Sequence, residues 1–247
     1  MYKLDVLKLT FSLTLLGMLS SGLGGFLGGI IKPKNKAILS SLYEITAGMM
    51  TGIVCFDMLP ESFYLTNVLS GIIGVIIGVM LVFCLDYILE QTNKKSTNLK
   101  KNKYSVTALV VIVSMAAHNI LEGLAVGSSL VYSTSFGISV MISIFLHDIP
   151  EGMIVGITEN SSKISILKIV LDSIFVGMTV GLGVFIGQIV GNISDTYISL
   201  SLSLASGAML YIVSCDLIPS SKKISSNKIS YVMYIVGILL GVSITNL

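Results

Sequence analysis

Apolar residues in this chain fall in runs of about 20, the length of a helix that crosses a bilayer, rather than in the short periodic stretches of a soluble fold. Eight such runs follow one another, separated by short polar connections. They cover residues 9–31, 39–60, 66–89, 105–130, 133–157, 165–190, 197–219 and 229–247. The pattern predicts an all-α polytopic membrane protein with eight transmembrane helices, folded as a single transmembrane domain over residues 1–247.

The composition supports this prediction. Hydrophobic residues make up 53% of the chain, charged residues only 11%, and the mean hydropathy is +0.92. Soluble enzymes and disordered chains are excluded, and a net charge of +2 indicates no nucleic-acid partner. The first apolar run continues to Ile31 without a convincing cleavage site, so we interpret it as a retained helix rather than a signal peptide.

Lysines predict the orientation, because Lys and Arg accumulate in cytoplasmic connections. The chain has no Arg, and 13 of its 15 lysines lie in alternate connections, within 32–36, 94–103, 163–168 and 222–228. Lys3 and Lys8 are the exceptions. We therefore expect a multi-pass protein of the plasma or inner membrane with both termini on the non-cytoplasmic side. The Lys-rich stretch 91–103 is predicted to be a solvated cytoplasmic loop.

An internal repeat relates the second and seventh runs. Residues 47–62 (AGMMTGIVCFDMLPES) align without gaps on residues 206–221 (SGAMLYIVSCDLIPSS). Four helices separate the two copies, so they cross the membrane in opposite directions, as in transporters built from inverted repeats. We expect spans 1–3 and 6–8 to form the repeat around spans 4 and 5.

The two histidines of the protein each open the same pattern, HNILEGLAVG from His118 and HDIPEGMIVG from His147. Positions i and i+4 share a helix face, so each histidine pairs with a glutamate, Glu122 or Glu151. Asn119 and Asp148 each follow one residue later and border the same region. Two such helices packed together would offer two imidazoles, three carboxylates and one amide.

Acidic side chains at this depth cost about 2.5–3.5 kcal/mol each if they face lipid, so they must face one another or a cavity. Their mutual repulsion requires protonation or a cation. A single His–Glu edge is as typical of a structural pair or a proton relay as of a metal site, but its duplication favours a metal. Imidazole with carboxylate suits Zn²⁺, Fe²⁺, Mn²⁺ or Cd²⁺. Pro150 could add a carbonyl ligand or simply kink the fifth span.

Further acids lie at the ends of the repeated spans. Asp57 and Glu61 are expected at the outer side and Asp216 at the cytoplasmic side, where they suit the entrance and exit of one pathway; ordinary interfacial acids are the alternative. Met50 precedes Asp57 by two turns and could lend a thioether, although core packing is the plainer interpretation.

These motifs resemble those of the ZIP (Zrt/Irt-like) divalent-metal transporters, in their prokaryotic branch. The resemblance covers the whole chain: HNILEG in the fourth span, HDIPEG in the fifth, and D-M-L-P and D-L-I-P at the ends of the second and seventh. It implies uptake of Zn²⁺ into the cytosol without an organic cofactor, and a homodimer with an elevator-like movement. It also implies a primary site of His118, Glu122, His147 and Glu151, whose glutamates bridge to a second ion at Asn119 and Asp148.

Two features depart from the family pattern. Val180 stands where many members carry an acid in span six, so the second ion would lose a ligand. The connection between spans three and four carries lysines instead of histidines, which argues against metal sensing there.

The sequence thus predicts a metal importer and not an enzyme. The alternative is an intramembrane zinc-dependent hydrolase, with a zinc-bound water and one glutamate as the base. The H-E-x-x-H motif is absent, and an inverted repeat with acids at both faces serves passage rather than cleavage.

Overall fold

The computed structural model describes residues 2–31, 36–98, 103–161 and 163–245, and these are helical apart from short connections. The helices are α1 (Tyr2–Ile30), α2 (Lys36–Ile53), α3 (Leu59–Leu65), α4 (Val68–Asn98), α5 (Lys103–Tyr132), α6 (Thr134–Ser161), α7 (Ile166–Gly191), α8 (Asp195–Ile212), α9 (Ile218–Ile224) and α10 (Lys228–Thr245). Two five-residue π-helical segments, Val54–Met58 and Val213–Leu217, join α2 to α3 and α8 to α9. The all-α prediction is confirmed.

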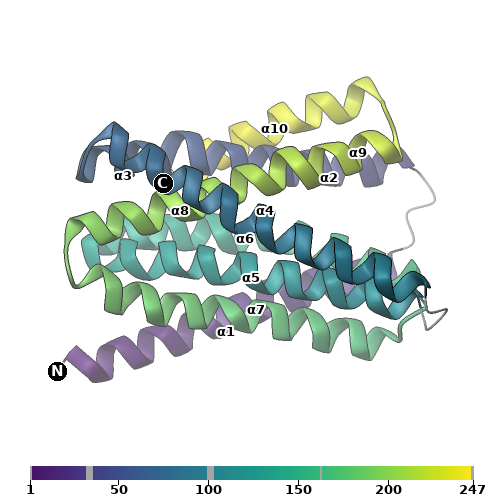
Figure 1. Ribbon diagram of the computed structural model, residues 1–247, viewed down its shortest axis with the longest axis horizontal. Helices are drawn as coiled ribbons and strands as arrows, with labels where there is room; N and C mark the ends of the chain where they lie inside the picture. The colour runs from purple at the N-terminus through teal and green to yellow at the C-terminus, as the bar shows by residue number, and fades with distance from the viewer. Residues whose placement is uncertain (1, 32–35, 99–102, 162, 246–247) are drawn as a thin grey trace.

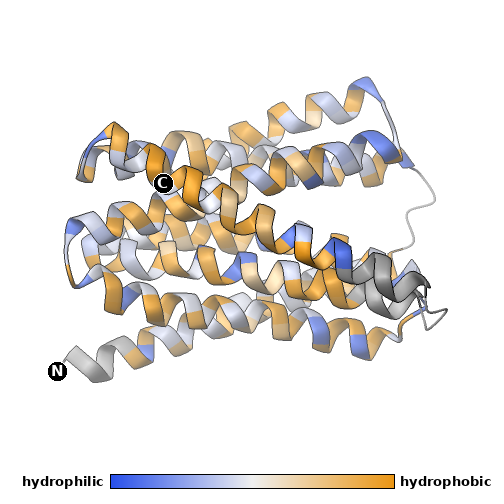
Figure 2. Ribbon diagram, in the orientation of Figure 1, coloured by the Kyte–Doolittle hydropathy of each residue, from blue (hydrophilic) through white to orange (hydrophobic). Residues whose placement is uncertain are grey.

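The helices match the predicted spans in order. Within the described ranges, seven helical stretches are long and apolar enough to cross a membrane, and α10 supplies a shorter apolar stretch, Lys228–Ile244. Hydrophobic residues occupy the middle of the helices, and hydrophilic ones gather toward the ends (Figure 2). Part of the predicted loop 91–103 is helical instead, because α4 continues to Asn98 and α5 begins at Lys103. The rest of that loop, residues 99–102, lies outside the described residues.

Of the lysines whose side chains the structure describes, all but Lys8 gather at one end of the molecule, where α6 joins α7 and α9 joins α10. We call this the lysine-bearing end; it holds Lys36, Lys163, Lys168, Lys222, Lys223 and Lys228. Helix α1 begins at the opposite end of the molecule, and α10 runs toward that end (Figure 1). Lys32, Lys34, Lys100 and Lys101 lie outside the described residues, and the orientation in the membrane stays a prediction.

Two groups of helices pack side by side. Helices α1, α5, α6 and α7 form a four-helix bundle with extensive mutual contacts. Helix α2 packs on α10, and α4 packs on α8, in a second group that also holds α3 and α9. The groups meet mainly where α5 contacts α8 and α4 and where α6 contacts α2.

The inverted repeat is visible in helix bounds and in contacts. Each bound of the α2–α3 unit lies 159 residues before its counterpart in the α8–α9 unit, as Lys36 and Asp195 show. The two units run in opposite directions (Figure 1). A Cβ atom on Gly48 would meet the Tyr234 carbonyl oxygen, and one on Gly207 would meet the Val75 oxygen, again 159 residues apart.

The same two-fold relation extends to the four-helix bundle. Gly24 of α1 packs against the Ile149 carbonyl of α6, and Gly183 of α7 packs against the Ile120 carbonyl of α5. The glycines differ by 159 residues and the carbonyls by 29, which is also the separation of His118 and His147. Helices α5 and α6 are therefore counterparts, and they lie at the centre of the repeat as expected.

Proline explains the π-helical segments. Pro60 and Pro219 have no N–H, and in an α-helix their rings would clash with the carbonyl four residues earlier. The preceding turns are widened instead: the Leu59 N–H bonds to the Val54 carbonyl and the Ile218 N–H to the Val213 carbonyl, five residues back in each case. The helices thus pass the prolines without a break.

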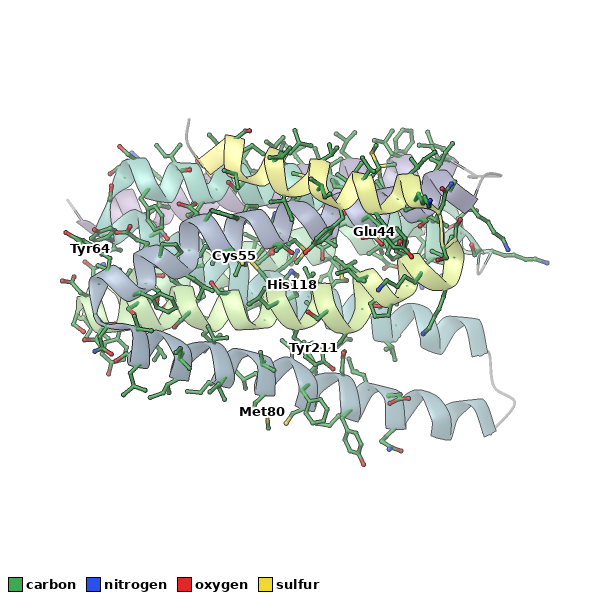
Figure 3. The ribbon with its side chains drawn as sticks, turned by 90° about the horizontal axis from the view of Figure 1, so that it is seen from above. Glu44, Cys55, Tyr64, Met80, His118 and Tyr211 are labelled. Carbon is green, nitrogen blue, oxygen red and sulfur yellow. The ribbon has the colours of Figure 1, made fainter. Side chains whose placement is uncertain are left out.

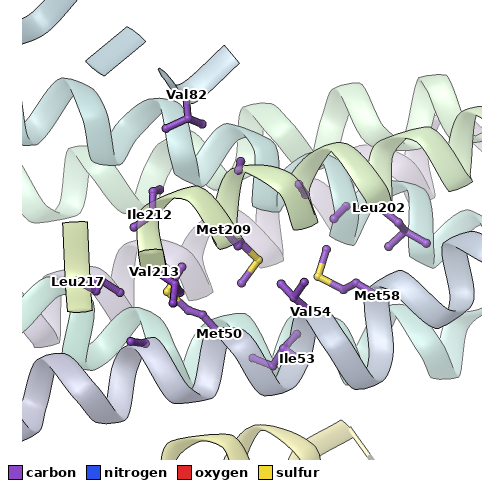
Figure 4. Packing of buried hydrophobic residues seen from close by; sticks show 14 of the residues in the cluster. Met50, Ile53, Val54, Met58, Val82, Leu202, Met209, Ile212, Val213 and Leu217 are labelled. Carbon is purple, nitrogen blue, oxygen red and sulfur yellow. The ribbon is translucent and has the colours of Figure 1, made fainter. Parts of the chain in front are cut away.

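A hydrophobic core lies between α2 and α8, and it borders α5 and α6 through Leu121 and Ile154. Figure 4 shows its larger side chains meeting across the two repeat units: Met50, Ile53, Val54, Met58, Leu202, Met209, Ile212, Val213 and Leu217. In lipid these side chains stabilise the fold through close van der Waals packing between the two repeat units rather than through removal from water.

The close glycine contacts generate a stability prediction. Gly24→Ala places a methyl group against the α6 backbone, at the Ile149 oxygen and Gly152 Cα, neither of which can move alone. We expect the free energy of unfolding to fall by about 1–3 kcal/mol. Circular dichroism of the purified protein during thermal unfolding measures this.

The matched control is Gly29→Ala in the same helix, where the added methyl meets only flexible Ile166 and Ile169 side chains. Equal melting temperatures for the two variants would contradict the proposed backbone contact.

Candidate metal site

His118 and Glu122 lie one turn apart on α5, and His147 and Glu151 lie one turn apart on α6. Because α5 and α6 pack against each other, the two His–Glu edges face one another. His118 lies about midway along the helices, as Figure 3 shows. All four side chains are buried, with 0–3% of their surface exposed.

One carboxylate oxygen is the centre of the cluster. The Oε1 atom of Glu122 lies 2.9 Å from the Nε2 atom of His118 and 2.9 Å from that of His147. Glu151 Oε1 lies 3.7 Å from His118 Nε2. One ligand atom from each of the four residues falls within 4.8 Å of the others, so a single ion could contact all four.

A neighbouring hydrogen bond fixes the ring of His147. Its Nδ1 lies 3.0 Å from the Ser143 carbonyl oxygen, which can only accept, so Nδ1 carries the proton and Nε2 presents a lone pair in the neutral ring. That lone pair faces Glu122 Oε1, another acceptor. Two acceptors at this distance need a proton or a cation between them, and an outer hydrogen bond of this kind is typical of metal-bound histidines.

Several buried atoms of the cluster have no hydrogen-bond partner among the described residues. They are both ring nitrogens of His118, Glu122 Oε2, Glu151 Oε1, Asp148 Oδ1 and Asn119 Oδ1. His118 Nε2 is near Glu122, but the two groups are not aligned for a hydrogen bond. Buried polar atoms are normally paired, and unpaired lone pairs on imidazole and carboxylate suit Zn²⁺ or a similar borderline metal.

Asp148 and Asn119 lie beside this cluster but are held by other helices. Asp148 Oδ2 accepts a hydrogen bond from the Ser20 hydroxyl of α1 at 3.2 Å, and its Oδ1 lies 3.7 Å from His147 Nε2. Asn119 Nδ2 donates to the Val176 carbonyl of α7 at 3.2 Å, which leaves Oδ1 free. Each residue therefore keeps one oxygen available for a second ion.

Val180 lines the same small cavity as Asp148 and packs in an apolar cluster with Val126 and Val184. Where an acid would complete a second site, the structure has a buried valine, 4% exposed. This position therefore offers no ligand to an ion beside Asp148.

The four residues assigned to the pathway occupy different settings. Met50 is fully buried in the hydrophobic core, which supports the packing interpretation. Asp57 and Asp216 lie at equivalent places in the two π-helical segments; Asp57 Oδ2 is buried without a partner, and Asp216 is exposed and accepts from Ser220 at 3.1 Å. Glu61 is half-buried on α3, one turn after Asp57.

Sequence reasoning missed the supporting groups Ser20 and Ser143, because a serine in an apolar span carries no pattern of its own. It also passed over Glu44 and Glu159, which are 2% and 0% exposed. An ionisable residue inside a span is a functional hypothesis by default, so that rule would have found both acids.

Comparison with known proteins agrees with this geometry. The family model described as ZIP Zinc transporter matches residues 89–246, which include both His–Glu edges and the second repeat unit. The chain belongs to the ZIP family.

Individual members are distant from it. The putative zinc transporter At3g08650 of Arabidopsis thaliana is 27% identical over 73% of this chain and 30% of its own length. Zinc transporter GufA of Myxococcus xanthus is 33% identical over 47% of this chain and 46% of its own length. Zinc transporter ZIP4 of Homo sapiens is 25% identical over 53% of this chain and 21% of its own length. The chain spans less than half the length of these curated relatives.

The site geometry predicts the effect of removing its central oxygen. In Glu122→Gln the amide replaces the charged carboxylate that both histidines approach, so we expect zinc affinity to fall by more than about 100-fold, beyond the cost of losing an outer-shell partner. Isothermal titration calorimetry of the purified protein with Zn²⁺ measures the change.

Asp195→Asn, an exposed acid at the start of α8, is the control and should retain the wild-type affinity. If Glu122→Gln and the control bind zinc with equal affinity, Glu122 is not a ligand of the metal.

Proposed function

We propose that this protein carries divalent transition metals, zinc first among them, across a cell membrane into the cytosol. The observation that carries the proposal is the convergence of two imidazoles and two carboxylates, all buried, on one point between α5 and α6. Packing of α5 against α6 does not by itself require these four polar side chains to lie so close together. The names of the relatives support zinc as the substrate; Fe²⁺, Mn²⁺ and Cd²⁺ suit the same ligands.

The ion's path follows from the two-fold relation. The metal would approach past Asp57 and Glu61, exchange water for the His and Glu ligands, and leave past Asp216. The hydrophobic core between α2 and α8 separates these acids from one another, so the ion cannot pass while that core stays packed. Transport then needs the four-helix bundle to move relative to the second group, carrying the metal ligands with it.

The arrangement of ligands also argues against the hydrolase alternative. A catalytic zinc keeps an open position for water and needs a base that is not a ligand. Here both glutamates converge with both histidines, so all four residues serve as ligands and neither glutamate is left as a separate base. We therefore assign transport rather than catalysis.

The lipid bilayer is the first partner. Many apolar side chains of α4 are exposed, among them Leu69, Ile76 and Met80, and a helix of this kind requires lipid or another protein. We propose a multi-pass protein of the plasma or inner membrane, with both termini outside and the lysine-bearing end in the cytosol. The homodimer implied by the resemblance remains part of the proposal.

Flux into proteoliposomes tests the function. Purified protein is reconstituted, and uptake of radioactive zinc is followed in wild type, Glu151→Ala and the Asp195→Asn control. We expect wild-type and control uptake well above protein-free vesicles and loss of uptake in Glu151→Ala, because the ion loses a carboxylate ligand. Wild type without uptake, or Glu151→Ala with full uptake, contradicts the proposal.

Binding should also depend on pH. Metal ligands must be deprotonated, so protons compete with zinc for both histidines and both glutamates. We expect zinc affinity to decrease steadily as the buffer is acidified and to recover on return to neutral pH. Calorimetric titrations in buffers of different pH measure this, and an affinity that is constant or rises on acidification would be inconsistent with His and Glu ligation.

A further inference from the structure

A hydroxyl group of α1 contacts the metal site from outside it. Ser20 is completely buried, and its hydroxyl oxygen lies 3.2 Å from Asp148 Oδ2 and 3.0 Å from the Gly17 carbonyl oxygen of its own helix. A hydroxyl has one proton to donate, so these two oxygens compete for it. Hydrogen bonds to a charged acceptor are the stronger ones, and a carboxylate therefore attracts this proton away from the carbonyl group.

The two-fold relation supplies an internal comparison for this hydroxyl. The shift of 159 residues relates Ser20 to Thr179 of α7, and it relates Gly17 to Val176. The Thr179 hydroxyl lies 2.7 Å from the Val176 carbonyl oxygen, but its second acceptor is the Ala116 carbonyl of α5, at 3.0 Å. Both acceptors of Thr179 are thus backbone groups, whereas Ser20 reaches an acidic side chain.

The residue equivalent to Asp148 explains this difference. The shift of 29 residues relates Asp148 to Asn119, whose side-chain amide donates to the Val176 carbonyl oxygen at 3.2 Å. An amide has its own donor and can anchor itself to the backbone. A carboxylate has none, so its orientation depends on a donor from another group. Ser20 supplies that donor to Asp148.

Asp148 needs such an anchor because there is free space on both sides of it. It lines a largely apolar cavity together with Val180 and Val184. It also lines a small polar cavity together with Asn119 and Glu151. The torsion angle that turns an aspartate carboxyl group has broad minima, so space of this kind leaves its direction undetermined unless a contact selects it.

The bond from Ser20 selects a direction toward the metal ligands. It occupies Oδ2 of Asp148 on the α1 side. The other oxygen, Oδ1, is buried without a hydrogen-bond partner and lies 3.7 Å from Nε2 of His147. The oxygen that the bond leaves available is therefore the one beside the imidazole that would hold the ion.

We propose that Ser20 is a positioning residue of the metal site. By donating to one oxygen of Asp148 it directs the other oxygen to the ion beside His147, and it does so from a helix that carries none of the assigned ligands. This inference rests on the proposed function. It goes beyond that function by assigning part of the metal affinity to a residue that does not touch the metal.

The second acceptor of Ser20 makes this anchor reversible. When Asp148 turns toward the polar cavity, the hydroxyl donates to the Gly17 carbonyl oxygen instead, and no buried donor is left unpaired. Breaking the bond therefore avoids the cost of an unsatisfied buried group. A transported ion must be released as well as bound, and a hydroxyl with two acceptors suits both steps.

Calorimetric titration of the purified protein with Zn²⁺ tests the positioning role. We expect Ser20→Ala to lower the zinc affinity by about 10–100-fold, the usual effect of removing an outer-shell partner. Ser20→Thr keeps the hydroxyl and copies the residue found at the equivalent position of α7, so it should restore most of the affinity. Wild-type affinity in Ser20→Ala, or no recovery in Ser20→Thr, would overturn the proposal.

Thr179→Val is the matched control, because it removes the equivalent hydroxyl from a residue whose acceptors are backbone carbonyls. Its melting temperature should fall while its zinc affinity stays at the wild-type value. Equal losses of zinc affinity in Thr179→Val and Ser20→Ala would mean that any loosening of the bundle weakens binding, and the proposal would be overturned.

A double-mutant cycle tests whether Ser20 acts through Asp148. Asp148→Ala removes the carboxylate, so adding Ser20→Ala to it should cause no further loss of zinc affinity. Losses that add up would place the effect of Ser20 elsewhere and contradict the proposal. Should Ser20→Ala fold poorly, Ser20→Cys takes its place in the cycle, because a thiol of similar size is only a weak donor.

Zinc flux into proteoliposomes separates this inference from the proposed function. Ser20→Ala should require about 10–100-fold more external zinc for half-maximal uptake, in line with its weaker binding. Wild type that binds zinc without transporting it contradicts transport, while the calorimetric titrations still decide on Ser20. An unchanged zinc dependence of uptake in Ser20→Ala contradicts the positioning role and leaves transport intact.

Discussion

The structure depends on one electrostatic constraint: carboxylates placed in an apolar interior must each find a positive partner. Glu122 Oε1 lies 2.9 Å from both histidines, and the hydrogen bond from His147 Nδ1 to Ser143 leaves the facing nitrogen with a lone pair in the neutral ring. Electron pairs therefore converge on a point that a cation has to fill. The ligands bind the ion, and the ion removes the repulsion between the ligands. Metal binding and local packing of the helices therefore contribute to the same free energy.

Glycine brings the backbones close enough for this geometry. Gly24 lets α1 approach α6, and Gly183 lets α7 approach α5, each against a carbonyl group of the metal-bearing helix. Helices in lipid associate through such close contacts, because an apolar side chain is out of water whether it faces another helix or the lipid. The hydrophobic effect therefore does not favour helix–helix packing over helix–lipid packing. The short approach also lets Ser20 of α1 reach Asp148, so the packing of glycines and the orientation of an acid are linked.

Patterns within one helix could be predicted from the sequence, whereas pairings between helices could not. The spans follow from hydropathy, and the His–Glu edges follow from i, i+4 spacing. The bond from Ser20 to Asp148 joins residues 128 apart and has no sequence signature. The repeat was seen only between residues 47–62 and 206–221, because elsewhere it survives in backbone contacts rather than in residue identity. Polarity predicts a loop from residue 91, but α4 continues past its apolar part to Asn98, since a solvated helix end carries no hydropathy signal.

The two π-helical turns have a mechanical consequence. Each holds one residue more than an α-helical turn, so the segment beyond it is rotated by about 100° relative to an uninterrupted helix. Sliding that extra residue along the helix by one position would turn Asp57 or Asp216 to a different face without breaking the helix. The same π-helical segment is present in both repeat units, and the acids that the two segments carry have different surroundings. One kind of local motion is therefore open to both repeat units, at acids whose surroundings differ.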